Sequence, residues 1–395
     1  LGPYFGVPCT IKENFELEGT PQTAGLVARR GRLSRTNAPA VARLLSAGAI
    51  PLGKTNVSEL CMWMESDNRV YGRSNNPYDH ARIVGGSSGG EGAIVGSGVS
   101  PFGLGADVGG SIRGPAFFNG VFGHKPTPGI VPNSGQFPLA ENDARDYLCT
   151  GPLARRAEDL MPLLRLFAGP DGEDVRCRDV ALGDPASVEW SGRRVVCIED
   201  NGKLPVSDEM RAAGERAALA LERRGGRIVR TKISALRDQF DIWSAMMGLA
   251  SDTPFGTMLG DGKPIPVARE LAKLALGRSE HTTMALMLAL TEKVPKLFPG
   301  QTKRLADVGR ALRGELEAAM GPGGVWLYPP YTTTAPRHRH AVREALTLTM
   351  PFAYQGIVNV MLLPATEVPL GLDRTGLPLG VQVIGRPDED HVTIA

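Results

Sequence analysis

Hydrophobic and polar positions along the chain predict helices and strands in alternation. Residues 5–12 and 49–53 have the pattern of short buried strands, and residues 38–47 that of a helix. Thr36 or Asn37 is expected to cap this helix and Gly48 to end it. Further on, the pattern predicts strands at 194–198 and 227–230, amphipathic helices at 208–224 and 303–320, an apolar helical stretch at 268–297, and strands and turns at 325–335 and 360–385. Alternating helices and strands indicate a layered α/β fold.

The stretch 84–129 departs from this pattern, because it is rich in glycine and serine. A helix of small residues is predicted from Ala93 to Val99, with the glycine runs around it as loops. Glycine loses more conformational entropy on folding than any other residue, so a dense run of it needs a reason. Close approach of the backbone to a ligand is one, and we expect the functional site here.

Composition narrows the class of protein. The 395 residues carry a formal net charge of only +2, which argues against a nucleic-acid partner. Five widely spaced cysteines, an odd number, indicate free thiols in a reducing compartment. His338 and His340 form a lone H-x-H pair without further ligands nearby, so we expect no metal and no cofactor. The cysteines are Cys9, Cys61, Cys149, Cys177 and Cys197.

Both ends of the sequence suggest a longer protein. The chain begins at Leu1 in a turn-like Leu-Gly-Pro, and residues 391–395 have the pattern of the first turn of a helix. No signal peptide and no run of 18 or more apolar residues is present. We therefore expect truncation at both ends, with any membrane anchor in the missing amino-terminal part.

Two short motifs suggest other chemistries. Residues 48–55 (GAIPLGKT) fit the phosphate-binding pattern G-x-x-x-x-G-K-[ST], but a predicted helix precedes them and Pro51 lacks an amide donor, so a structural turn is preferred. Residues 85–89 (GGSSG) fit G-x-S-x-G, the nucleophile elbow of α/β-hydrolases. That elbow follows a strand, whereas the residues before Gly85 are polar and irregular. An elbow-type esterase is therefore the second interpretation.

A third arrangement combines two glycine-rich loops with a distant lysine. Serine is a weak nucleophile that needs a base. Ser87 lies in GGSSGG and Ser111 in DVGGSIR, and no S-x-x-K motif occurs in the chain. Lys12 lies in CTIKENF, where burial would lower its pKa and let the neutral amine act as a base. A surface ion pair with Glu13 is the simpler alternative for this lysine.

At these residues the chain resembles the amidase-signature family. GGSSGG is followed by GADVGGSIRGPA and GHKP, and a lysine lies in a short strand well before the first serine. GVPCTIKEN, GAIPLGKTN, SNNPYD and the late turn GLPLG also fit, so the resemblance covers essentially the whole chain. SELCMW, FFNGVFGHKP and NSGQFPLA are most similar to the vertebrate-type fatty-acid amide hydrolases within this family. One position departs from it: Gly105-Ala106-Asp107 stands where GTD or GSD is usual.

The resemblance implies a fold and a catalytic triad. The fold would be one amidase-signature domain over residues 1–395, with a large mixed twisted β-sheet covered by helices on both faces and a catalytic core at 84–129. Lys12 would be the base, Ser87 the bridging serine after a cis peptide bond, and Ser111 the nucleophile that forms an acyl-enzyme.

Further residues take supporting roles by the same resemblance. Backbone amides of the loop would hold the oxyanion, and these belong to Val108, Gly109, Gly110 and Ser111. Cys61 falls where family members line the substrate channel, beside Ser87, although a small buried hydrophobe is an equal alternative. Ser88, Asp107 and Arg113 would support the loops, the last two as a structural ion pair.

The implied reaction is hydrolysis of a fatty-acid amide to a fatty acid and an amine or ammonia. The helices at 268–297 would then meet a lipid surface, although plain core is the alternative; their charges are Arg269, Glu270, Lys273, Arg278, Lys293 and Lys296. We expect an intracellular, membrane-associated enzyme with a lipid amide substrate, no nucleic-acid partner and a homodimeric assembly. The alternatives are an amidase of small or aryl amides, a glutamine-type subunit that needs a glutaminase partner and tRNA, and a pseudoenzyme.

Overall fold

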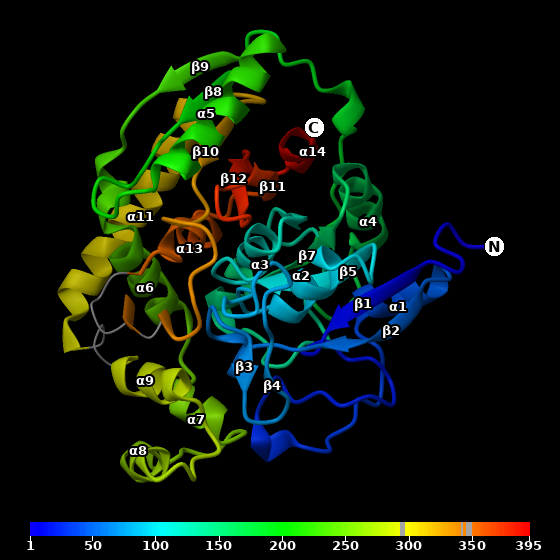
Figure 1. Cartoon of the computed structure of the whole chain (residues 1–395), viewed down its shortest axis with the longest axis vertical. Helices are drawn as coiled ribbons and strands as arrows, with labels where there is room; N and C mark the ends of the chain where they lie inside the picture. The colour runs from blue at the N-terminus through cyan, green and yellow to red at the C-terminus, as the bar shows by residue number, and fades with distance from the viewer. Residues whose placement is uncertain (293–296, 341–342, 345–349) are drawn as a thin grey trace.

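The computed structural model describes residues 1–292, 297–340, 343–344 and 350–395. Within these ranges ten strands form one sheet, in the order β2-β1-β5-β7-β6-β11-β12-β10-β8-β9 (Figure 1). Pairs β1–β2, β1–β5, β8–β10 and β8–β9 are parallel and the others antiparallel, so the sheet is mixed, as expected. The strands are β1 (Pro8–Lys12), β2 (Ile50–Thr55), β5 (Phe102–Asp107), β6 (Phe122–Lys125), β7 (Cys149–Ala154), β8 (Arg194–Cys197), β9 (Arg227–Arg230), β10 (Val325–Tyr328), β11 (Ala365–Leu372) and β12 (Pro378–Ile384).

Helices cover both faces of this sheet. One face carries α2 (Gly89–Gly96), α3 (Arg113–Phe118), α6 (Gln239–Ala250), α11 (Pro299–Met320) and α13 (Ala353–Val360), and the other carries α1 (Pro39–Ser46), α4 (Leu160–Phe167) and α5 (Asp208–Arg223). Three further helices lie together at the lower left of Figure 1, namely α7 (Phe255–Leu259), α8 (Val267–Ala275) and α9 (Thr283–Thr291). Among the described residues, no helix combines the length and the apolar character that crossing a membrane requires.

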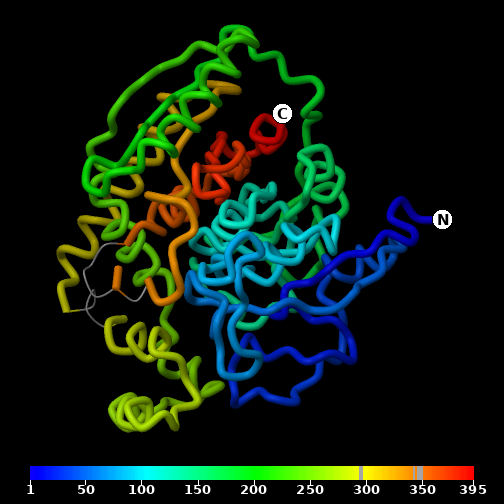
Figure 2. The backbone as a smooth tube through the Cα atoms, in the orientation of Figure 1, coloured from blue at the N-terminus to red at the C-terminus, as the bar shows by residue number. Residues whose placement is uncertain are grey.

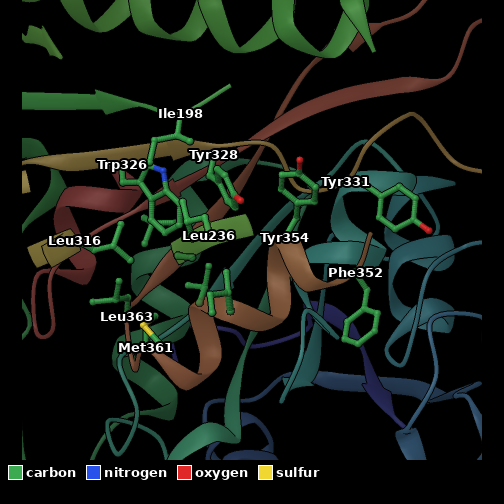
Figure 3. Packing of buried hydrophobic residues seen from close by; sticks show 14 of the residues in the cluster. Ile198, Leu236, Leu316, Trp326, Tyr328, Tyr331, Phe352, Tyr354, Met361 and Leu363 are labelled. Atoms are coloured by element: carbon green, nitrogen blue, oxygen red, sulfur yellow. The ribbon is translucent and has the colours of Figure 1, made fainter. Parts of the chain in front are cut away.

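Alternation along the strands divides the core between the two faces. Val325 and Leu327 of β10 pack in the cluster that includes Ala218 of α5, whereas Trp326 and Tyr328 pack in the cluster that includes α6, α11 and α13. Figure 3 shows Trp326 and Tyr328 beside Tyr354 of α13, with ring centroids 4.4 and 4.9 Å apart along this series. Such aromatic contacts add to the free energy gained by burying apolar area.

The central strands come from the far end of the chain. β11 and β12 lie between β6 and β10, so residues after 360 hold the amino-terminal and middle parts of the sheet together. Figure 2 shows this red C-terminal segment flanked by cyan and green parts of the chain. The helix α14 (Asp390–Ile394) closes the described chain, and His124 Nε2 lies 3.1 Å from Asp390 Oδ1, which ties this helix to β6.

The predicted elements of the first half are present, with two corrections. Helix α1 matches the prediction, but the cap is wrong: no side chain caps the helix, and Asn37 Oδ1 accepts a hydrogen bond from Glu18 N instead (2.9 Å). The small-residue helix begins at Gly89, four residues before Ala93. The reason is close packing, because an ideal Cβ on Gly89 would lie 2.3 Å from Ser66 Oγ and one on Gly90 would lie 2.4 Å from Asn56 N.

The second half adds helices that the pattern did not predict. α6 and α13 are absent from the prediction, and both are apolar on most sides, which hides the helical period. The stretch 268–297 contains two helices, α8 and α9, separated at Gly277, whose φ of 67° ends the first. Residues 293–296 of this stretch, with Lys293 and Lys296, lie outside the described residues.

Candidate active site

Lys12 lies at the end of β1 and is buried, with 1% of its surface exposed. Its Nζ donates hydrogen bonds to Ser87 Oγ at 2.8 Å and to the carbonyl oxygen of Ala106 at 3.1 Å. The surface ion pair with Glu13 is wrong, because the Glu13 carboxylate accepts hydrogen bonds from the backbone amides of Thr23 and Ala24 instead. Burial lowers the pKa of Lys12, against the opposing fields of Cys61, Asp107 and Glu91.

The loop before α2 presents Ser87 to this lysine. The peptide bond between Gly86 and Ser87 is cis, as the resemblance implies. Ser66 Oγ lies 3.1 Å from the carbonyl oxygen of Gly85 and 3.3 Å from that of Ser87, which fixes the loop. An ideal Cβ on Gly86 would lie 2.2 Å from the carbonyl oxygen of Trp63, so only glycine fits there. Helix α2 follows, but residues 74–84 contain no strand, so the elbow of an α/β-hydrolase is not supported.

The phosphate-loop motif has a structural role. Its residues 50–55 form the strand β2, rather than a turn, and Lys54 Nζ donates to the carbonyl oxygen of Pro21 at 2.6 Å. The lysine is therefore occupied by the protein backbone.

Ser111 lies in the loop between β5 and α3, next to the Ser87 loop. Ser88 N donates to the carbonyl oxygen of Ser111 at 3.1 Å, and Ser88 Oγ donates to that of Ala106 at 3.3 Å. Lys12 and Ser88 thus both donate to the Ala106 carbonyl oxygen, which connects β1, the Ser87 loop and β5. Ser111 is 8% exposed whereas Ser87 is 1% exposed, so Ser111 is the more accessible of the two residues.

Asp107 and Arg113 form a buried ion pair that braces the Ser111 loop. The Asp107 carboxylate accepts hydrogen bonds from Gly110 N at 2.7 Å and Ile112 N at 3.0 Å, and Arg113 Nη2 lies 3.1 Å from Asp107 Oδ1. Burial alone would raise the pKa of Asp107, but the Arg113 guanidinium, the Ile112 amide and Lys125 together outweigh burial and hold this pKa below its usual range. The pair therefore supports the loop.

Arg113 also connects this loop to the C-terminal part of the chain. Its guanidinium donates to the Gln355 carbonyl oxygen at 3.0 Å, to Gln382 Oε1 at 2.6 Å and to Asn359 Oδ1 at 2.6 Å. These three partners were not predicted, because each lies more than 240 positions away in sequence and no short motif contains them.

The glycines of the loop have different neighbours. Gly110 has a φ of +107°, and an ideal Cβ there would lie 2.0 Å from Gln355 Oε1, so a side chain is excluded. An ideal Cβ on Gly109 would lie 3.5 Å from Trp243 Cζ2, an ordinary contact. Val108 packs partly buried against the cluster of α1 and α4. The Gly110 amide is occupied by Asp107, whereas the amides of Val108, Gly109 and Ser111 bond to no other residue in the described ranges.

Two residues near the site were missed or left open by the sequence. Trp243 of α6 stands beside Gly109, and its ring centroid lies 4.9 Å from that of Phe352 in an edge-to-face contact. Cys61 ends the 3₁₀ helix η2 (Glu59–Cys61), with a φ of 57°, close enough to Lys12 and Ser87 that both influence its pKa. Burial raises the pKa of the Cys61 thiol. All five cysteines lie in the described ranges and are free.

Comparison with known proteins agrees with this geometry. The family model described as Amidase matches residues 1–394. The chain belongs to the amidase family. Fatty-acid amide hydrolase 2 of Homo sapiens is 43% identical over 404 residues, covering 100% of this chain and 74% of that protein. A glutamyl-tRNA(Gln) amidotransferase subunit of Cyanothece sp. is 28% identical, covering 98% of the chain and 81% of that protein.

Solved structures have the same architecture. A glutamyl-tRNA(Gln) amidotransferase subunit of Thermotoga maritima matches with a TM-score of 0.82 and 26% identity, covering 100% of this chain and 82% of that one. The peptide amidase of Stenotrophomonas maltophilia matches with a TM-score of 0.77 and 24% identity, covering 100% and 81%, and this likeness concerns the fold alone. The fold is thus the amidase-signature fold, and the chain is an amide-hydrolysing enzyme of that family.

Proposed function

We propose that this chain hydrolyses fatty-acid amides through a Ser-Ser-Lys triad of Lys12, Ser87 and Ser111. The observation that carries the proposal is the 2.8 Å hydrogen bond between Lys12 Nζ and Ser87 Oγ in a buried site. A lysine whose pKa is lowered by burial supplies a neutral amine, and the bonded serine passes the proton on.

The reaction has two halves. Lys12 accepts a proton from Ser111 through the Ser87 hydroxyl, and Ser111 Oγ attacks the amide carbonyl carbon. The same relay returns the proton to the leaving nitrogen, the C–N bond breaks, and an acyl-enzyme remains. Water, activated by the same base, then releases the fatty acid and restores Ser111.

The oxyanion is held by backbone amides of the Ser111 loop. Because Asp107 already accepts the Gly110 N–H, the amides of Val108, Gly109 and Ser111 are the donors left for the substrate oxygen. Preorganised donors of this kind stabilise charge that develops in the transition state, each by about 3–4 kcal/mol. The Asp107–Arg113 pair keeps the loop in place for this role.

Two observations support a long apolar substrate. The chain is 43% identical to human fatty-acid amide hydrolase 2 over its whole length. In addition, Trp243 packs with Phe240 and Phe352 directly beside Gly109, so an aromatic wall borders the loop that receives the carbonyl. An acyl chain suits such a wall better than a small polar amide does.

Lipid-surface contact would involve α8 and α9. Leu276 is 70% exposed and Leu290 is 47% exposed, whereas Leu286 on the same unit is fully buried against α7. The pair of helices α8 and α9 therefore has a side that packs in the core and an apolar side that is exposed. Lys273 of α8 and Arg278 lie near the exposed Leu276 in sequence, a combination typical of interfacial helices.

The test compares oleamide with propionamide as substrates and labels the protein with a fluorophosphonate. We expect labelling of Ser111 and faster hydrolysis of oleamide, with loss of turnover in Lys12→Ala, Ser87→Ala and Ser111→Ala while circular dichroism shows intact folding. Full activity in Ser111→Ala would refute the mechanism. Preference for propionamide would instead support the second candidate, an amidase of small or aryl amides.

A further inference from the structure

Glu91 is a fully buried carboxyl group beside the triad. It lies on α2, four residues after Ser87, and none of its surface is exposed. Thr10 Oγ1 of β1 donates to its Oε2 at 2.6 Å, and Thr55 Oγ1 of β2 donates to its Oε1 at 2.7 Å. Gly103 of β5 makes room for it, because an ideal Cβ there would lie 1.7 Å from Glu91 Oε2.

This carboxyl group faces the strand that carries Lys12. Thr10 and Lys12 are two positions apart on β1, so their side chains point to the same face of the sheet, toward α2. The two hydroxyl bonds clamp β1 and β2 to α2, whose preceding loop presents Ser87. Glu91 therefore fixes the base and its bridging serine relative to each other through one side chain.

Three ionisable groups raise the pKa of Lys12 against the effect of burial, and each belongs to a different element. They are Cys61 from η2, Asp107 from β5 and Glu91 from α2. Asp107 is neutralised by Arg113, and burial raises the pKa of the Cys61 thiol, which keeps it neutral. In the described part of the chain, Glu91 has hydrogen bonds from the two threonines and from no basic side chain. Above its own pKa the Glu91 carboxylate therefore acts on Lys12 without a basic partner of its own, alongside the larger effects of Cys61 and Asp107.

We propose that Glu91 is a positioning residue that sets how strongly Lys12 holds its proton. The inference rests on the proposed Ser-Ser-Lys mechanism. Burial drives Lys12 toward the neutral amine, but an amine that binds protons too weakly is a poor base. A negatively charged Glu91 stabilises the Lys12 ammonium and therefore raises the pKa of this base.

The titration of Glu91 fits this role. Burial raises its pKa to about 7, although the hydrogen bonds from Thr10 and Thr55 and the charge of Lys12 oppose the rise. Glu91 also faces Cys9 of β1, whose pKa burial and Glu91 raise to about 12, so that thiol stays neutral. Because Glu91 and Lys12 each influence the pKa of the other, the rise of the rate with pH depends on both groups.

The direction of the pH shift expected in Glu91→Gln follows from the charges of Glu91 and Lys12. Activity needs neutral Lys12, so the rate rises with pH through the pKa of the lysine. Glu91→Gln keeps the shape and removes the charge, so the ammonium loses stabilisation and the acid limb moves to lower pH. We expect a shift of about 0.5–1 pH unit, typical of one unit charge at this range in a protein interior, and a lower plateau rate because the base is weaker.

The experiment measures the rate of fluorophosphonate labelling of Ser111 from pH 5 to 10 in the wild-type chain and in Glu91→Gln. Glu270→Gln is the matched control, since Glu270 is a buried carboxyl on α8, away from the triad. If Glu91→Gln does not fold, Thr55→Val replaces it. That variant removes one hydrogen bond from the Glu91 carboxylate, favours the neutral acid, and should shift the limb in the same direction by less.

The outcomes distinguish a failure of this inference from a failure of the proposed triad. A wild-type chain that is not labelled at Ser111 at any pH refutes the triad itself. If the wild-type chain is labelled normally and the rise of the labelling rate with pH is unmoved in Glu91→Gln, the role of Glu91 is refuted. A uniform loss of rate at every pH also refutes it, because a purely structural clamp would give that result. A limb moved to lower pH in the Glu91 variant alone supports it.

Discussion

Arg113 Nη2 lies 3.1 Å from Asp107 Oδ1, and neither side chain has any exposed surface. The carboxylate also accepts two backbone amides of the Ser111 loop, and the guanidinium has three partners on α13 and β12. One ion pair thus joins the loop that carries the proposed nucleophile to a part of the chain far away in sequence.

Arg113→Met should destabilise the protein by about 3–5 kcal/mol, because it leaves the Asp107 charge buried and unpaired. Urea unfolding followed by circular dichroism measures this loss. Arg176→Met is the control, since Arg176 pairs with Asp143 and Asp146 at the surface, where such pairs contribute about 0–1 kcal/mol. Equal losses in the two variants would contradict the brace.

Two adjacent glycines should respond differently to alanine. In Gly110→Ala the new Cβ meets Gln355 Oε1 at 2.0 Å on a backbone with φ of +107°, so we expect a clear fall in the melting temperature. In Gly109→Ala the Cβ meets Trp243 at 3.5 Å, so stability should hold while turnover falls, because the methyl group stands on the approach to the loop. Thermal melts together with oleamide hydrolysis distinguish them. A Gly109→Ala chain with full turnover would place the substrate elsewhere.

Glu367 of β11 predicts a pH dependence of stability. It is fully buried, and neither carboxyl oxygen has a hydrogen-bond partner among the described residues. Burial raises its pKa well above the usual value, so the folded chain keeps the proton that the unfolded chain releases above about pH 4.3. The free energy of unfolding contributed by this group therefore falls as pH rises from that value toward the folded pKa.

Glu367→Gln should remove this loss. Its stability advantage over the wild-type chain is expected to be small near pH 4 and to grow toward pH 8. Denaturant unfolding at both values measures it. An advantage that is constant across this range would mean that Glu367 does not titrate between the two states.

The outer side of α8 and α9 can be tested with vesicles. Leu276→Ser combined with Leu290→Ser should weaken binding to vesicles containing anionic phospholipid by roughly tenfold, given about 25 cal/mol for each Å² of apolar surface withdrawn from lipid. Leu372→Ser is the control, because Leu372 is 54% exposed at the end of β11. Equal binding of the double variant and the control, in a co-sedimentation assay, would place these leucines outside any lipid contact.

The sequence singled out the proposed triad but not the residues that support it. Lys12, Ser87 and Ser111 lie in dense motifs, and the Lys12–Ser87 contact is present. Gln355, Asn359 and Gln382 could not be found this way, since an amide that braces a distant arginine leaves no local pattern. Glu91 did leave a signal, because it is the only charged residue between positions 84 and 106.

The errors in the predicted helices and strands have the same origin. Periodicity located α1 and α5 because each has one exposed and one buried face, whereas β8 was located as a short apolar run whose adjacent Val195 and Val196 are both buried. It failed for α13, where all eight residues are buried, and it placed the start of α2 too late because glycine is a poor helix former in isolation. Tertiary packing decides both cases.

The three partners of Arg113 lie 242, 246 and 269 residues beyond it. During synthesis, all three proposed triad residues emerge from the ribosome long before α13 and β12 are made. A nascent chain of the first two hundred residues would therefore hold its proposed nucleophile in a loop whose Asp107–Arg113 pair lacks its partners on α13 and β12. We expect amide hydrolysis to begin only when α13 and β12 dock, so the docking of these two elements serves as the trigger for activity.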